Sequence, residues 1–313
     1  MPSIVSFGRY LPAAVLRNDE LAARLQVDAA WISGVSGIEE RRIALPGETV
    51  ADMAFEAGRD CLSRACLSHT SAKPGLILVA SGSSERRFPG PAAEVAHRLG
   101  FAGTPAIDLA LASAGSLFGI VLGAQLAPQY GPVLLIASEK MSAPAVTEPL
   151  DKNIAILFGD GAGACLIQPG GPGLEIADSV LHSDGAWAND LQLGLTGPIH
   201  MNGPTVIMQA ARKIPAAISE LLKRNAVAPD AIAQFVMHQA NQNLIDRVAR
   251  ALQVPAARFY SNIQKYGNTS SASLLIAASE WHEQPALKAG DRICLAAFGA
   301  GFHWGAALLT AAF

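Results

Sequence analysis

Short apolar runs typical of buried strands alternate with segments of helical periodicity through the first half of the chain. The strand-like runs lie at residues 3–8, 76–82, 104–111, 132–139 and 163–168. Helical patterns occupy residues 49–65 and 91–100. Because alternating strands and helices favour an α/β fold with a mostly parallel sheet, we expect that class for this chain.

The same alternation restarts near residue 169. Strand-like and helical runs follow one another at 175–184, 205–225, 232–239, 243–254 and 292–299. Each half also ends on an aromatic residue, alternating glycines and an apolar strand, at 157–167 and again at 297–309. Because internal similarity on this scale indicates duplication, we predict one duplicated body with halves 1–168 and 169–313. The glycines precede strands rather than opening a helix, which argues against a dinucleotide-binding loop.

One segment has the composition of a membrane span. Residues 109–127 carry no charged side chain over 19 residues, close to the ~20 that a helix needs to cross a bilayer. The segment also contains glycines, serines and a glutamine, and no Lys/Arg cluster flanks it. These features favour a central helix of a globular protein, buried on all sides.

Charge and cysteine content exclude several classes of protein. The formal net charge is −3 over 313 residues, which leaves no bulk basic surface for nucleic acid. The four cysteines, Cys61, Cys66, Cys165 and Cys294, lack metal-ligand spacing, and we interpret them as reduced thiols. The N-terminus does not have the pattern of a secretory signal. We therefore expect a cytoplasmic protein without a metal site and without a nucleic-acid or membrane partner.

Three short motifs contain side chains that could carry chemistry. Ser113 lies between two alanines in the apolar stretch, five residues after Asp108. His238 ends a strand-like run, and Asn268 follows Gly267 thirty residues later. A single histidine at a strand end is more often structural, and an Asn-Thr pair after glycine is usually a turn or a helix cap. No motif is specific by itself.

Taken together, the motifs resemble those of one family. The residues "HQAN", "YGNTS", "FGDGAGA" and "FGAGFHWGA" are similar to those of the β-ketoacyl-acyl-carrier-protein synthase III (KAS III, FabH-like) group of the thiolase superfamily. The segments "WISGVSGIEERRI" and "RFPGPAAEVAHRLG" also resemble that family, so the similarity runs along the whole chain. It implies a thiolase-like, duplicated five-layer αβαβα fold and a homodimer.

The resemblance also implies a mechanism. A nucleophile at the N-terminus of a buried helix takes an acyl group from acyl-CoA, and the enolate of a decarboxylated malonyl-thioester on a carrier protein then attacks it. Ser113 stands where the family has its nucleophilic cysteine, and His238 and Asn268 correspond to the pair that stabilises the enolate. The backbone N–H groups of Ser113 and Ala300 would line the oxyanion hole.

The same resemblance assigns substrate contacts. Trp31 would stack on the adenine of CoA, Lys152 could bind a phosphate, and Gly203 would lie near the pantetheine arm. Phe88 would reach into the acyl pocket of the partner subunit. No metal or redox cofactor is implied, because acyl-CoA is a substrate.

The sequence departs from the family pattern at several positions. Serine replaces the nucleophilic cysteine, and Val35, Asn243 and Pro204 replace residues that often contact CoA or the carrier protein. A thiol titrates near 8.5, whereas a serine hydroxyl is far less acidic and needs a base within hydrogen-bond reach. His238 is the base that the sequence offers.

Three hypotheses for the function follow. In the first, the chain is an acyltransferase that uses Ser113 natively and passes the acyl group to a malonyl-thioester, an alcohol or an amine. In the second, it is a KAS III whose cysteine was deliberately exchanged for serine, which inactivates it. In the third, it is a non-catalytic subunit of an active paralogue, although the intact His238 and Asn268 argue against this.

Overall fold

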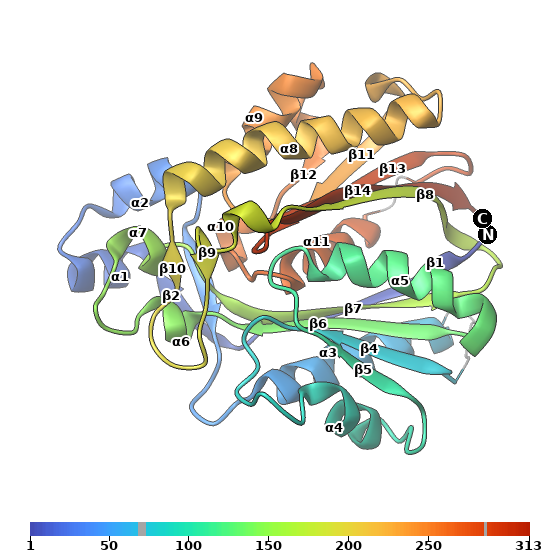
Figure 1. Ribbon diagram of the computed structural model, residues 1–313, viewed down its shortest axis with the longest axis horizontal. Helices are drawn as coiled ribbons and strands as arrows, with labels where there is room; N and C mark the ends of the chain where they lie inside the picture. Colours follow the sequence, from blue (N-terminus) through green and yellow to red (C-terminus); the bar gives the residue numbers. More distant parts are fainter. Residues whose placement is uncertain (68–72, 285–286) are drawn as a thin grey trace.

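A ten-stranded sheet forms the centre of the computed structural model, which describes residues 1–67, 73–284 and 287–313 (Figure 1). Its strands from the first half are β1 (Ser3–Tyr10), β4 (Leu76–Ala80), β5 (Ala106–Leu109), β6 (Val133–Lys140) and β7 (Asp160–Gln168). Those from the second half are β8 (Gly173–Ser183), β11 (Ile232–Met237), β12 (Phe259–Tyr260), β13 (Arg292–Gly299) and β14 (His303–Ala312). Their order is β12-β11-β13-β14-β8-β1-β7-β6-β4-β5.

Helices connect and cover these strands. The larger ones are α3 (Val50–Leu67), α4 (Pro91–Arg98), α5 (Gly115–Tyr130), α8 (Gly203–Arg224), α9 (Gln242–Leu252) and α11 (Ala272–His282). Smaller helices are α1 (Asn18–Leu25), α2 (Ala29–Ser36), α6 (Ser142–Ala145), α7 (Lys152–Ala155), α10 (Ile263–Tyr266), η1 (Gly185–Trp187), η2 (Pro229–Ala231) and η3 (Ala256–Arg258). Two strand pairs lie outside the main sheet: β2 (Ala14–Arg17) with β3 (Glu40–Ile43), and β9 (Leu191–Gln192) with β10 (His200–Met201).

The two halves of the sheet have the same topology. In the first half β4 pairs parallel with β5 and β6, and β7 pairs antiparallel with β6 and β1. In the second half β11 pairs parallel with β12 and β13, and β14 pairs antiparallel with β13 and β8. The halves join where β1 meets β8, with Ser3 opposite Glu175. The repeated glycine motifs lead into β7 and β14, which occupy equivalent places.

The expected α/β class is confirmed, but the prediction of a mostly parallel sheet is wrong. Four neighbouring strand pairs are parallel and five are antiparallel. Strands joined through a helix, such as β4 and β5 through α4, run parallel, because the helix returns the chain to the same edge of the sheet. The short connection between β13 and β14 instead forces an antiparallel pair.

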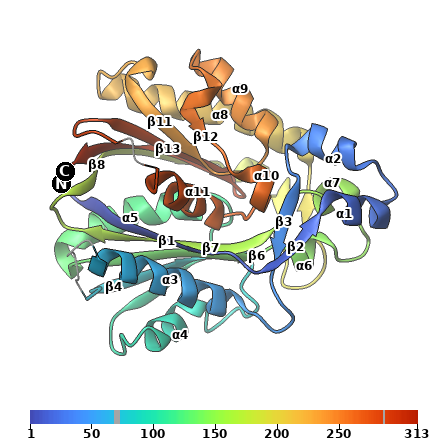
Figure 2. The same ribbon diagram turned by 180° about the vertical axis from the view of Figure 1, so that it is seen from behind.

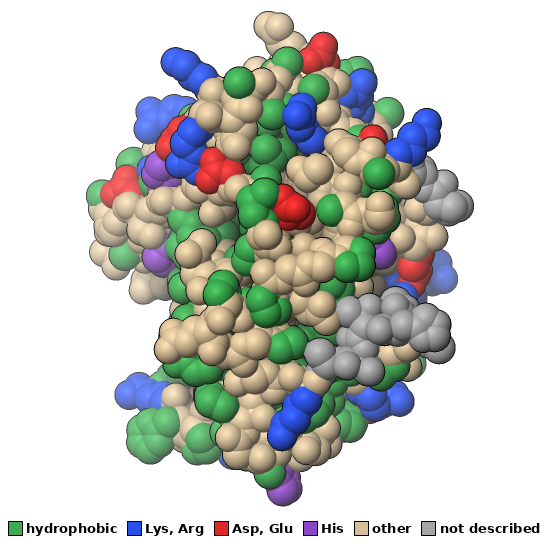
Figure 3. Space-filling view, turned by 90° about the vertical axis from the view of Figure 1, so that its right-hand side faces the viewer, with side chains coloured by type: hydrophobic (Ala, Val, Ile, Leu, Met, Phe, Trp, Pro, Cys, Tyr) green, Lys and Arg blue, Asp and Glu red, His purple; other side chains and the backbone are tan. Residues whose placement is uncertain are grey.

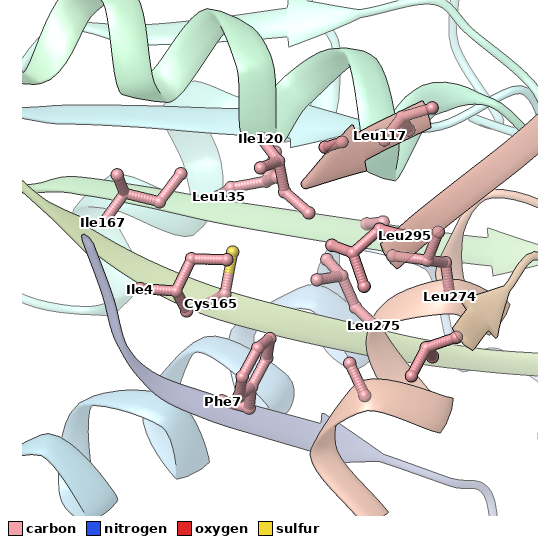
Figure 4. Packing of buried hydrophobic residues seen from close by; sticks show 14 of the residues in the cluster. Ile4, Phe7, Leu117, Ile120, Leu135, Cys165, Ile167, Leu274, Leu275 and Leu295 are labelled. Atoms are coloured by element: carbon pink, nitrogen blue, oxygen red, sulfur yellow. The ribbon is translucent and has the colours of Figure 1, made fainter. Parts of the chain in front are cut away.

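Five layers result, as the family resemblance implies. Helices α8 and α9 cover the outer face of the second half-sheet, and α3 and α4 cover that of the first (Figures 1 and 2). Helices α5 and α11 lie between the half-sheets. Figure 4 shows the packing in this middle layer, where Leu117 and Ile120 of α5 and Leu274 and Leu275 of α11 meet the strands. The nucleophile position therefore precedes a helix at the centre of the molecule.

Helix α5 contains most of the uncharged stretch, but it is not buried on all sides as the sequence suggested. Its inner face is fully covered, whereas Leu122 is 40% exposed and Tyr130 is 42% exposed. Within residues 1–67, 73–284 and 287–313, α11 is the helix that lies beside α5 in the middle layer, and the opposite flank of α5 has no helix against it (Figure 1). Among the described residues, no helix combines the length and the apolar character needed to span a bilayer.

Charged side chains of both signs are scattered over the surface. Figure 3 shows the face on which the termini lie, where Lys and Arg side chains are interspersed with Asp and Glu mainly around the rim. Neither sign dominates that face, in keeping with the small net charge.

Candidate active site

Ser113 occupies a sharp bend between β5 and α5. It is buried and has a left-handed backbone with φ of 61°, a conformation that non-glycine residues adopt only when their surroundings impose it. The end of β13 packs against this bend. A Cβ atom on Gly299 would lie 2.2 Å from the Ala112 carbonyl oxygen and 3.0 Å from Ser113 Cβ, so glycine is required for the close approach.

The N-terminus of α5 follows two residues after Ser113. Its N-cap residue, Ala114, offers no side-chain acceptor to the first turn of the helix. Free N–H groups and the helix dipole make such an end electropositive, which favours a negative charge developing at Ser113.

His238 lies just beyond β11 and is held from two sides. Its backbone N–H donates to the Ala296 carbonyl at 2.9 Å, and its Nδ1 lies 2.6 Å from Ser273 Oγ. Burial lowers the pKa of His238 from 6.5 to about 4, although a hydrogen bond with the Ser270 backbone acts in the opposite direction. The imidazole is therefore neutral at pH 7.

Asn268 is anchored by its backbone in the loop after α10. Its N–H donates to the Leu157 carbonyl at 2.9 Å, and its carbonyl accepts from the Gly159 N–H at 3.1 Å. The side-chain Oδ1 accepts the Ser270 N–H at 2.9 Å. Because this bond occupies the oxygen of the amide, the Nδ2 group is the end that can donate to a ligand.

Ser113, His238, Asn268 and Ala300 meet at one pocket. Its volume is about 110 Å³, enough for several non-hydrogen atoms rather than one water. Apolar side chains from β10, α8 and the loop after β9 form the opposite wall. They include Leu193, Ile199, Met201, Val206, Ala210 and Ile214. The pocket thus combines a small polar cluster with an apolar chamber, as is typical of small-molecule sites.

A second depression, which we call the mouth groove, leads into this pocket. It is lined by Trp31, Val35, Asp151, Asn153, Ile154, Ile156, Leu157, Met201, Asn202, Gly203, Pro204, Ile207 and Asn241. The two linings share Leu157, Met201, Gly203, Ile207 and Asn241. Lys152 stands beside the groove, with its Nζ 5.5 Å from the centre of the Trp31 ring. Three of the four predicted substrate contacts, Trp31, Lys152 and Gly203, therefore gather at this groove.

Phe88 lies apart from these residues. Its side chain is 85% exposed and does not line the pocket of its own chain. None of the four cysteines lines that pocket either. Cys61, Cys165 and Cys294 are buried in packed layers, and burial raises the pKa of Cys61 to about 12. Within residues 1–67, 73–284 and 287–313, no three or more His, Cys, Asp or Glu side chains cluster as metal ligands would.

His303, in the segment "GFHWG", also lies outside the pocket lining. Its Nδ1 is 2.7 Å from Ser183 Oγ, and its ring meets that of Phe118 edge-on. These contacts agree with a hydrogen-bonded structural histidine.

Two residues at the site were missed from the sequence. Ser270 Oγ accepts the Ser113 N–H at 3.0 Å and lies 3.4 Å from Ser113 Oγ. Glu139, at the end of an apolar strand, is buried behind it. The serine-rich run "NTSSAS" and an acid in "LLIASEK" were the available signals.

The expected base, His238, makes no hydrogen bond to Ser113 in this structure. Ser113 Oγ makes its hydrogen bond with Ser270 rather than with His238. In addition, the Ser113 N–H, one of the two predicted oxyanion donors, is already engaged by Ser270.

Two sequence profiles match the chain. That of 3-oxoacyl-[acyl-carrier-protein] synthase III covers residues 107–185, and that of its C-terminal region covers residues 222–311. A β-ketoacyl-[acyl-carrier-protein] synthase III from Gloeobacter violaceus is 34% identical, over 98% of this chain and 98% of its own. The chain belongs to the β-ketoacyl-acyl-carrier-protein synthase III family.

Solved structures agree with this assignment. The 3-oxoacyl-[acyl-carrier-protein] synthase III from Aquifex aeolicus superimposes with a TM-score of 0.92 at 33% identity, covering 99% of this chain and 100% of that one. The priming β-ketosynthase of the R1128 polyketide pathway gives 0.89 at 28% identity, covering 100% and 97%. The KAS III resemblance and the thiolase-like fold are confirmed, and the chain is a KAS III-like condensing enzyme.

Proposed function

We propose that the chain takes an acyl group from acyl-CoA onto Ser113 and passes it to a malonyl-thioester in fatty-acid or polyketide biosynthesis. The observation that carries this proposal is that Ser113, His238 and Asn268, which are far apart in sequence, converge on one largely apolar pocket. Carbon dioxide leaves as the new carbon–carbon bond forms, and a 3-oxoacyl thioester is the product.

In the acylation step, Ser113 Oγ forms a bond to the thioester carbonyl carbon, and the carbon–sulfur bond then breaks. The oxyanion that forms in between is stabilised by the N-terminus of α5 and by the N–H groups of Ser113 and Ala300. Because the Ser113 N–H already donates to Ser270 Oγ, the oxyanion must share that donor or displace the hydroxyl.

In the condensation step, His238 and Asn268 stabilise the enolate. The Asn268 Nδ2 group can donate because Oδ1 is held by the Ser270 N–H. The neutral imidazole of His238 is suited to donating a hydrogen bond to the enolate oxygen without protonating it. The enolate carbon then attacks the acyl group and releases Ser113 Oγ.

The mouth groove is the proposed binding site for the CoA arm. Trp31 offers a flat surface for the adenine, Lys152 a positive charge, and Gly203 space beside the pantetheine chain. No metal or redox cofactor is needed for this chemistry. We also propose that the enzyme acts in the cytoplasm.

A carrier protein is the proposed bearer of the malonyl group. A shallow depression with Arg212, Arg247 and the exposed Met208 adjoins the mouth groove, with which it shares Pro204 and Ile207. Cationic side chains around an apolar centre suit an acidic protein that delivers a thioester through the groove.

A homodimer is the proposed assembly. Strand β5 is an edge strand, and its Ile107 is 47% exposed. Together with Phe88 and Leu122 it presents exposed apolar side chains, which a second subunit would cover. Phe88 would then lie at the acyl pocket of the partner.

Intact-mass measurement after incubation with a panel of acyl-CoAs tests the function. We expect one acyl adduct on the unaltered chain, absent in Ser113→Ala, whose mass gives the acyl group. Addition of malonyl carrier protein should remove the acyl group from Ser113 and give a 3-oxoacyl product. If acyl-CoA acylates Ser113→Cys but not the unaltered chain, the protein is instead a synthase inactivated at its nucleophile. No loading of either form would contradict the proposal and favour a non-catalytic subunit.

A further inference from the structure

The imidazole of His238 has one of its two nitrogens engaged inside the protein. Its Nδ1 lies 2.6 Å from the hydroxyl oxygen of Ser273, while the residue lines the pocket. A neutral imidazole carries a single ring proton, on either Nδ1 or Nε2, and the partner of one nitrogen decides which of them holds it. The contact with Ser273 therefore decides whether Nε2 offers a proton or a lone pair to a ligand.

Helix α11 places Ser273 for this contact. The residue lies in the first turn of that helix and is 2% exposed, and its neighbours Ala272 and Leu274 are fully buried. Its backbone N–H donates to the Ser270 carbonyl at 3.2 Å. Because α11 lies in the middle layer between the half-sheets (Figures 1 and 2), its first turn meets the end of β11, just before His238. The hydroxyl thus reaches the imidazole from a packed element.

The hydroxyl oxygen of Ser273 also accepts a second hydrogen bond. The backbone N–H of Gln239 donates to it at 3.0 Å. The side chain of Gln239 fixes this turn, because its Nε2 donates to the Met237 carbonyl at 2.7 Å and its Oε1 accepts the Asn262 N–H at 3.2 Å. Since a backbone N–H can only donate, the bond from Gln239 has a single direction and occupies one lone pair of the hydroxyl.

The two tautomers of His238 leave the Ser273 hydroxyl in different states. With the proton on Nδ1, the oxygen would accept from both His238 and Gln239, and its own proton would have no acceptor among the described residues. With the proton on Nε2, the hydroxyl donates to the lone pair of Nδ1, and both contacts of Ser273 are satisfied. Because an unpaired hydroxyl proton is costly in a protein interior, the second arrangement is favoured.

The ring that Ser273 contacts is neutral at pH 7. Burial lowers the pKa of His238 from 6.5 to about 4, so the imidazolium form is not populated. The dipole of α11 acts in the same direction, because the N-terminal end of a helix disfavours a nearby positive charge. A carboxylate beside Nδ1 would instead favour the imidazolium, whereas the Ser273 hydroxyl carries no charge. The ring therefore has one proton to place rather than two.

We propose that Ser273 is a positioning residue, whose hydroxyl donates to Nδ1 of His238 and so fixes the ring proton on Nε2 for the enolate. The inference rests on the proposed condensation. As the malonyl carbon–carbon bond breaks, carbon dioxide leaves and the bonding electrons form the enolate, whose oxygen accepts hydrogen bonds from His238 Nε2 and Asn268 Nδ2. Neither side chain gives up its proton. With the other tautomer, a lone pair at Nε2 would face the developing negative charge and repel it.

Nitrogen NMR of the protein with ¹⁵N-labelled histidine rings reads the tautomer directly, without any substrate. The signals of His238 are assigned by their loss in His238→Gln. At pH 7 we expect them to show a protonated Nε2 and an unprotonated Nδ1. In Ser273→Ala, Nδ1 loses its donor, so we expect both tautomers to be populated. A protonated Nδ1 in the unaltered chain, or identical His238 signals in Ser273→Ala, would overturn the proposal.

The kinetic effect of Ser273→Ala should be confined to the enolate step. Without acyl-CoA, malonyl carrier protein loses carbon dioxide and takes a proton from solvent to give acetyl carrier protein, which intact mass measures. We expect the variant to slow this decarboxylation by about 10- to 100-fold, because losing an oxyanion donor outright costs about 100- to 1000-fold. Acylation of Ser113 by acyl-CoA, which forms no enolate, should change by less than about threefold.

The matched control is Ser279→Ala, further along α11. Ser279 is also buried, but its hydroxyl accepts a hydrogen bond from Arg9 and does not contact His238, so the tautomer and both rates should stay as in the unaltered chain. An equal loss of acylation and decarboxylation in Ser273→Ala would indicate a structural role and overturn the proposal. If the unaltered chain has the expected tautomer but does not decarboxylate malonyl carrier protein, the proposed condensation is overturned together with the role of Ser273 in it, whereas the tautomer assignment stands.

Discussion

The neighbours of each polar side chain at the site determine which of its atoms are free and which charge state is favoured. His238 is buried and paired with a neutral hydroxyl, so its charged form is disfavoured. The Oδ1 atom of Asn268 accepts the Ser270 N–H, so the Nδ2 group is left to donate to a ligand. Glu139 is also buried, and the hydroxyl groups of Ser83 and Ser271 offset part of the cost of burying its carboxylate.

The pKa of His238 makes a prediction for stability. The folded-state pKa of about 4 lies below the unfolded value of 6.5, so the unfolded state binds more protons between these values. Stability is therefore lost as pH falls through this window. Between pH 7 and pH 5 the loss from this residue is about 2 kcal/mol.

Urea unfolding of the unaltered chain and of His238→Gln at both pH values measures this loss. The difference in unfolding free energy between pH 7 and pH 5 should be about 2 kcal/mol smaller in the variant. An identical pH dependence in the two proteins would show that His238 is not the group responsible.

At the scale of elements, the site exists where four connections meet. The bend before α5, the segment after β11, the loop before α11 and the turn after β13 each contribute one of its polar residues. They approach so closely that Gly299 has no room for a side chain. The geometry of Ser113 therefore depends on packing between the two halves as much as on its own loop.

Gly299→Ala should damage both stability and the site. The added Cβ would meet the Ala112 carbonyl oxygen at 2.2 Å, so the bend at Ser113 must shift. We expect the free energy of unfolding to fall by about 1–3 kcal/mol. We also expect slower acylation of Ser113 by acyl-CoA.

The control is Gly34→Ala in α2, where an added Cβ meets nothing within 4 Å. It should be neutral or slightly stabilising, because alanine favours a helix. Equal stability of both variants to urea would contradict the steric argument.

At the scale of the whole molecule, several large apolar side chains remain exposed in the part of the chain that the structure describes. The edge strand β5 exposes Ile107, α5 exposes Leu122, and the side chain of Phe88 is almost fully exposed.

A charge on this edge should separate the proposed subunits. Ile107→Asp should weaken the dimer at least about tenfold, since an edge-strand charge opposes pairing. Sedimentation velocity over a dilution series measures the change. Leu45→Asp, at a position 52% exposed elsewhere, should leave the distribution unchanged. A monomeric unaltered chain would contradict the proposed assembly.

The sequence by itself determined the main elements, the α/β class and the family. Periodicity located β4, β6, β13, α3 and α8 because buried strands and helices must place apolar residues at regular spacing. The motifs also pointed to Ser113, His238 and Asn268, which the structure brings to one pocket.

Only the tertiary structure decided strand direction, exposure and the partners of each polar group. Local patterns are the same for parallel and antiparallel strands, so the mixed sheet could not be predicted from them. Glu139 and Ser271 are 132 residues apart in sequence but share a hydrogen bond, and no spacing relates them. Their contact arises from the packing of β6 against the loop before α11, which is a property of the folded layers and not of either segment.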